Sequence, residues 1–96
     1  MRCMLKMELD TQAGNKAITD GSLPKILQQV MDKVQPEAAY FTTESGSRTA
    51  FVFFDLADSS DIPAIAEPAF LNLGAKVTFM PVMNQEDLQR GLAQLR

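Results

Sequence analysis

Six side chains in this sequence are candidates for binding a ligand or moving a proton. They are Lys6, Glu8, Tyr40, Arg48, Asp55 and Glu67. Lys6 and Glu8 lie two residues apart in a predicted strand, so they point to the same face of a sheet. If Asp55 shares that face on a neighbouring strand, it could meet Lys6 and form a polar spot in an apolar cavity. The simpler interpretation, which we prefer, is a cross-strand ion pair at the sheet margin or at a dimer rim.

Tyr40, Arg48 and Glu67 each have a functional and a structural interpretation. Tyr40 could aim its hydroxyl into a cavity, but we expect it to be half-buried with its hydroxyl in water. Arg48 follows a turn and could clamp an anionic ligand, although an exposed turn arginine is the expected outcome. Pro68 should kink its helix and could place Glu67 at the lip of a pocket. We prefer a kink that bends the helix over the sheet, with Glu67 in solvent.

Residue types that are missing exclude several kinds of chemistry. The sequence has no histidine and a single cysteine, Cys3, which we expect to be an inert core residue. Ser-His-Asp machinery, a His-ligated haem and the usual zinc sites are therefore excluded, and no nucleotide-binding glycine motif occurs. Asp55, Asp58 and Asp61 recur every third residue, but acids at a helix start are expected from capping alone. We predict no metal and no cofactor.

Composition limits the partners and the location. The chain has 96 residues and a net charge of -3, with its nine basic residues scattered. We predict no nucleic-acid partner, because phosphate binding needs clustered Lys and Arg. No apolar run approaches the length of a membrane span, and the first residues do not form a signal peptide. The expectation is a cytoplasmic protein of one domain, covering residues 1–96, with no membrane partner.

Hydrophobic periodicity and turn residues predict eight elements. A strand over 2–9 is followed by a short helix to about Asp20 and an amphipathic helix from Ser22 that ends at Pro36. Strands over about 38–44 and 49–56 flank the turn signal Ser45-Gly46-Ser47. A largely apolar helix opens at Ser59-Ser60-Asp61 and ends at Gly74. A last strand over 76–83 contains Pro81, which indicates an edge position, and Asn84 caps a closing helix with Asp87 three residues on.

This order is typical of an α+β, ferredoxin-like βαββαβ fold with a C-terminal helix and a four-stranded antiparallel sheet. The third strand is apolar on both faces, with Ala50, Val52, Phe54 and Leu56 on one and Phe51 and Phe53 on the other. One of these two sides belongs to the sheet face that the helices leave open. Met80 or Phe79 should add to that open face. We expect a second copy of the chain to cover it, as a homodimer. The alternative is a monomer whose C-terminal helix covers the face.

Three stretches resemble a small uncharacterised bacterial family of about this length. They are 36–41 (PEAAYF), 46–52 (GSRTAFV) and 66–71 (AEPAFL). The element order also resembles the dimeric α/β-barrel group, which includes antibiotic-biosynthesis-type monooxygenases and muconolactone isomerases. The resemblance implies a ferredoxin-like fold and dimerisation, but no activity and no catalytic residues. The haem-handling branches of that group depend on a histidine that this chain lacks.

Two functions remain open at this point. The first is a non-catalytic homodimer, either purely structural or binding a small apolar molecule between sheet and helices. The second is a cofactor-independent monooxygenase or isomerase acting on a small aromatic or lactone-like substrate. That enzyme would need a pocket with a proton-transfer group, supplied by Glu67, Lys6, Glu8 or Tyr40. A regulatory ligand sensor would also need a separate partner, and the sequence contains no DNA-reading helix or basic patch.

Overall fold

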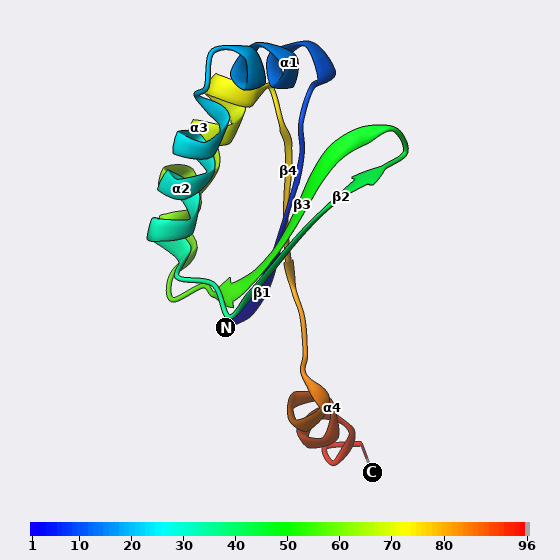
Figure 1. The fold of residues 1–96 in the computed structure, drawn as a ribbon. Coiled ribbons are helices and arrows are strands. Elements are labelled where there is room, and N and C mark those ends of the chain that lie inside the picture. The colour runs from blue at the N-terminus through cyan, green and yellow to red at the C-terminus, as the bar shows by residue number, and fades with distance from the viewer. Residues whose placement is uncertain (96) are drawn as a thin grey trace.

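The computed structural model describes residues 1–95 and has the predicted α+β, ferredoxin-like order (Figure 1). Its strands are β1 (Arg2–Glu8), β2 (Ala38–Glu44), β3 (Ser47–Asp55) and β4 (Lys76–Pro81). Its helices are α1 (Thr11–Thr19), α2 (Leu23–Val34), the 3₁₀ turn η1 (Ser59–Asp61), α3 (Ile62–Leu73) and α4 (Gln85–Leu92). Over residues 1–95, no helix is both long and apolar enough to cross a membrane.

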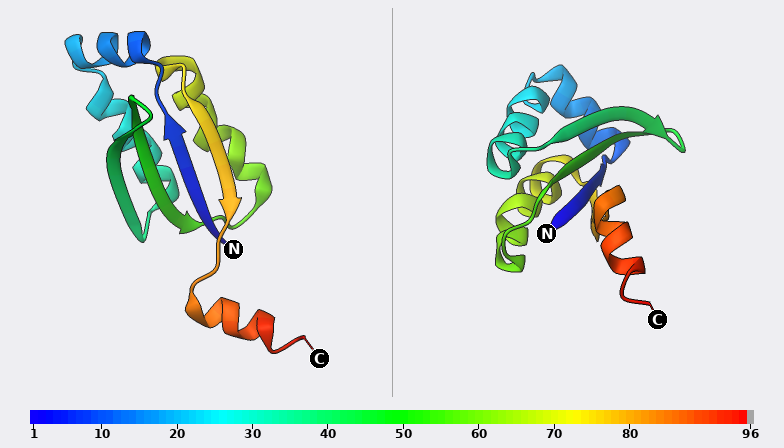
Figure 2. Two further views of the ribbon diagram at one scale, coloured as in Figure 1. Left: turned by 90° about the vertical axis from the view of Figure 1, so that its right-hand side faces the viewer. Right: turned by 90° about the horizontal axis from the view of Figure 1, so that it is seen from below.

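The four strands form one antiparallel sheet in the order β2-β3-β1-β4. The first and third strands are therefore central and the other two are edges, as predicted. Pro81 is the last residue of the edge strand β4, where its missing N–H leaves no gap in a central ladder. Figure 2 (left) looks onto the open face of this sheet, with α2 and α3 behind it.

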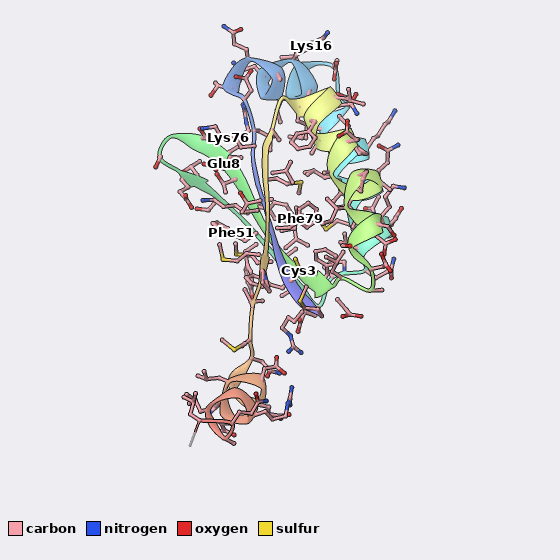
Figure 3. The ribbon with its side chains drawn as sticks, turned by 180° about the vertical axis from the view of Figure 1, so that it is seen from behind. Cys3, Glu8, Lys16, Phe51, Lys76 and Phe79 are labelled. Atoms are coloured by element: carbon pink, nitrogen blue, oxygen red, sulfur yellow. The ribbon has the colours of Figure 1, made fainter. Side chains whose placement is uncertain are left out.

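The core lies between the sheet and the helices. Alternate residues of the two central strands point into it, and apolar residues of α2 and α3 pack against them. The fully buried side chains include Cys3, Leu5, Met7, Val30, Val52, Phe54 and Leu73. Phe79 lies opposite Leu5 and packs edge-on against Phe54, with ring centroids 6.4 Å apart. Of the two candidates for the open face, Phe79 is thus packed against the core (Figure 3). Met80 lies on the open face, opposite Met4.

Local signals account for the turns and helix ends. Ser45 and Gly46 both have positive φ, the conformation that a two-residue hairpin turn with the right twist requires. Asn84 and Asp87 form a reciprocal capping box at the start of α4. The predicted helix start at Ser59 differs in detail, because η1 precedes α3 and Asp58 accepts the Ser60 N–H at 2.8 Å.

The open face of the sheet is not covered by any element within residues 1–95. It carries Met4, Lys6, Phe51, Phe53 and Met80, in strand positions that alternate with core residues. The C-terminal helix α4 lies beyond the end of the strands and does not cover this face (Figure 1). The monomer that shields itself with its own helix is therefore not the structure formed.

Helix α4 also makes the molecule elongated. The radius of gyration is 15.1 Å, against roughly 12.5 Å for a compact domain of this length. Its apolar stripe of Leu88 and Leu92 is exposed, as is Leu95 shortly after the helix. Two apolar surfaces, the open sheet face and the α4 stripe, consequently lack a partner within residues 1–95.

Candidate functional site

Lys6 and Glu8 lie together on the open face, in a small cluster of charges. The Lys6 ammonium donates to Glu44 Oε1 at 2.6 Å and lies 3.9 Å from Glu8 Oε2. It also lies 5.6 Å from the centre of the Phe51 ring, within cation–π range. The hydrogen bond to Glu44, with the charges of Glu44 and Glu8, raises the pKa of Lys6 above its ordinary value. A lysine of raised pKa stays protonated near neutral pH, so it does not serve as a base.

Asp55 does not meet Lys6. Both side chains are on the open face, but Asp55 lies opposite Arg2, whereas Lys6 lies opposite Phe51, four residues earlier in β3. The Asp55 carboxylate instead accepts from the Met1 amino group at 2.6 Å. The partner that the sequence analysis missed is Glu44, the last residue of β2. Glu44 lies two residues after Thr42 and four after Tyr40 in β2, so its side chain points to the open face, as theirs do.

Two further candidates are separate from this cluster. Tyr40 lies opposite Phe51 on the edge strand β2 and is 64% exposed. Glu67 is exposed on α3. Neither is brought together with Lys6 by a hydrogen bond or ion pair in the part of the chain that the structure describes.

Of the three spaced aspartates, Asp58 caps the helix start and Asp61 makes no side-chain capping hydrogen bond. Asp58 accepts the Ser60 N–H, and hydrogen bonding to Ser60 lowers the pKa of Asp58. Asp55 is held by Met1, at the far end of β3 from the hairpin turn. Within residues 1–95, no group of three or more Cys, Asp or Glu side chains is arranged to hold a metal ion.

An apolar pocket of about 310 Å³ lies between α2 and the β2–β3 hairpin. We call it the hairpin pocket. It is lined by Leu9, Leu23, Leu27, Phe41, Thr42, Arg48, Thr49 and Ala50. The tip of the hairpin curves away from the helices, so the sheet and the helix layer separate there (Figures 1 and 2). Phe41 is consequently 59% exposed although it points to the core face, whereas Ala50, directly opposite it on β3, is buried.

Arg48 extends from this pocket over helix α1. Its Nη2 donates to Asn15 Oδ1 at 2.9 Å and its Nη1 to the Thr11 carbonyl at 3.5 Å. Both acceptors are neutral. Helix α1 accommodates the guanidinium because residue 14 is glycine, where a Cβ would lie 2.5 Å from Arg48 Nη1. The structure therefore places a guanidinium at the exposed edge of an apolar lining.

A larger depression of about 650 Å³ lies between the α1–α2 connection and the end of α3. Its lining includes Lys16, Lys25, Asp20, Gln29 and Asn72. Hydrogen bonding to Ser22 lowers the pKa of Asp20, so this carboxylate stays ionised beside the two lysines. Charges of both signs and amides favour water at this surface over an apolar ligand.

The hairpin pocket is thus the candidate site with the clearest chemistry. Sequence analysis named Arg48 but not the apolar lining. The available signals were the i, i+4 pair Leu23 and Leu27 on α2 and the aromatic Phe41 in a strand position facing the helices. No protein-family model matches the sequence, and no curated protein is significantly similar to it.

Proposed function

We propose that this chain is a non-catalytic homodimer of the dimeric α/β-barrel type that binds a small apolar molecule in the hairpin pocket. The proposed binding function rests on the pocket itself. Its volume of about 310 Å³ is at the lower end of the range for small-molecule sites. Leucine, phenylalanine and alanine side chains form most of its wall, and Arg48 is the charged residue in the lining.

The lining favours binding over catalysis. It contains no carboxylate, lysine, tyrosine or cysteine side chain, the groups with which this chain could transfer a proton near neutral pH. An apolar ligand gains about 0.8 kcal/mol for each CH₂ group removed from water, before the entropy of association is subtracted. A ligand that buries about six such groups would gain roughly 5 kcal/mol gross.

A second copy of the chain is the proposed partner for the open sheet face. Phe51, Phe53 and Met80 lie on that face, which no helix or strand in the described part of the chain covers. Helix α4 lies toward the open-face side of the sheet, away from α2 and α3, and its apolar stripe is exposed (Figure 2). A copy stacked on the face could contact both surfaces at once. The elongated shape of the single chain and the resemblance to dimeric α/β-barrel proteins support the same arrangement.

The binding proposal is tested with the neutral probe 2-naphthamide and ¹⁵N-labelled protein. We expect amide resonances around Leu23, Leu27, Phe41 and Ala50 to shift in a saturable way. Leu27→Trp should fill the pocket and abolish the shifts. The same substitution at Leu71, which is exposed on the outer side of the molecule, is the control and should leave them unchanged. Absent shifts, or shifts confined to the open sheet face, would contradict the proposed site.

The dimer is tested separately by sedimentation equilibrium. The expected mass is twice the 10.6 kDa of one chain. A single species of 10.6 kDa at concentrations up to 100-fold above those of the binding experiment would overturn the dimer without touching the pocket.

A further inference from the structure

We infer that the hairpin pocket takes an amphipathic anion, a molecule with an apolar body and a carboxylate or similar planar anionic group that pairs with Arg48. The inference rests on the proposed binding function and names the ligand class. It follows from the charge state, the positioning and the surroundings of this one arginine.

Arg48 differs from the other described arginines in its partners. Arg2 pairs with Glu37 at 2.9 Å and with Asp87 at 2.6 Å, and Arg90 also pairs with Asp87. Within residues 1–95, Arg48 has no carboxylate within 4.0 Å. Arginine is always ionised in proteins, so this positive charge lacks a partner of opposite sign.

The guanidinium is nevertheless held in place. The Asn15 side chain and the Thr11 carbonyl accept from it, and Gly14 gives it room against α1. These contacts orient the group without neutralising it, and they use two of its five N–H donors. The nearest acid on this helix, Asp10, accepts the Ala13 N–H at 3.0 Å as the helix cap. An oriented arginine with free donors is suited to bidentate recognition of a planar anion.

The surroundings supply the apolar half of the recognition. Leu23, Leu27 and Phe41 contribute the apolar part of the lining, and Arg48 is the charged residue among the lining residues. The guanidinium makes its hydrogen bonds at the exposed edge of this lining, so salt should screen an ion pair there. A neutral apolar ligand would leave that charge without a partner, whereas an amphipathic anion would supply one.

The test compares two probes of the same shape, 2-naphthoate and neutral 2-naphthamide. With the unmodified protein at low salt, we expect naphthoate to bind about tenfold tighter, the usual effect of a charge-assisted hydrogen bond. The preference should shrink as salt is raised. Arg48→Gln should remove the preference while naphthamide still binds. Arg90→Gln, which removes an arginine outside the pocket lining, is the matched control and should retain the preference.

A second variant keeps the test decisive if Arg48→Gln fails to fold. Asn15→Asp places a carboxylate at the atom that now accepts from Arg48, on an exposed helix position, and should also abolish the preference. Naphthamide binding without any preference for naphthoate would overturn the inference and leave the proposed function standing. Binding of neither probe would overturn the proposed function. A preference for naphthoate that persists in both variants would show that a group other than Arg48 binds the carboxylate, and would overturn the inference.

Discussion

The α-carbon of Gly14 lies directly against the guanidinium of Arg48, so close that a Cβ at residue 14 would come within 2.5 Å of Arg48 Nη1. Arg48 projects from β3 and Gly14 belongs to α1, more than thirty residues earlier in the chain. The absence of a side chain on one element thus permits the placement of a charge from another. This relationship joins the helix layer to the hairpin pocket.

Gly14→Ala should separate the stability of the fold from the function of the pocket. The flexible end of Arg48 can move aside, and alanine is more favourable than glycine in a helix interior by about 1 kcal/mol. Urea unfolding should therefore show unchanged or slightly raised stability. The displaced guanidinium should nevertheless lower the preference for 2-naphthoate over 2-naphthamide several-fold. An unchanged preference would show that the position of Arg48 over α1 does not matter to the pocket.

Two lysines on the apolar stripe of α4 should dissociate the proposed dimer. Leu88→Lys with Leu92→Lys places charges on two exposed leucines that, in our proposal, contact the second copy. Burying unpaired charges is costly, so sedimentation equilibrium should show a large shift toward 10.6 kDa. Gln89→Lys with Ala93→Lys adds the same charge at the same spacing on a neighbouring part of the helix. If both double variants remain dimers, α4 takes no part in the interface.

Local chemistry made much of the fold predictable. Ser45-Gly46 specified the β2–β3 turn through its backbone conformation, and Asn84 with Asp87 specified the start of α4 through their reciprocal hydrogen bonds. Pro81 indicated an edge strand because it cannot donate to a ladder. Each of these signals acts within a few residues, so no knowledge of the tertiary structure was needed.

Register and layer spacing were not predictable in the same way. Whether Phe79 or Met80 faces the core depends on the pairing of β4 with β1, and a shift of one residue reverses it. The choice of Glu44 over Asp55 as the partner of Lys6 depends on where β2 and β3 end relative to β1. The hairpin pocket depends on how far the hairpin curves away from α2, for which the sequence carries no local signal.

Asp87 should make the start of α4 sensitive to acid. The Asn84 N–H, Arg90 and Arg2 lower its pKa below the ordinary value of 3.8. A carboxylate whose pKa is lowered by folding stabilises the folded state above the unfolded value, and loses that effect as pH falls through the folded one. ¹³Cα shifts of α4 should therefore report loss of helix as the pH falls below about 3.8.

Asp87→Asn should remove much of this dependence. The variant should have less α4 helix than the unmodified protein at pH 7, and the difference should fade in acid. Asp32→Asn on α2, where the carboxylate accepts from Gln28, is the control and should leave the α4 profile unchanged. An α4 profile that is flat from pH 7 to pH 2.5 in the unmodified protein would contradict the assigned role of Asp87.

Gly74 and Gly91 should respond in opposite ways to alanine. Gly74 ends α3 with a φ of +53°, which costs an L-residue about 1–2 kcal/mol, and a Cβ there would lie 3.2 Å from the Cβ of Asp10. Gly91 lies within α4 and has no positive φ, and a Cβ at that residue would meet nothing within 4 Å. Urea unfolding should show a loss of at least about 1 kcal/mol for Gly74→Ala and no loss for Gly91→Ala. Equal stabilities of the two variants would mean that the contact between the end of α3 and the start of α1 is loose enough to accommodate a side chain. The packing that positions α1 under Arg48 would then be equally loose.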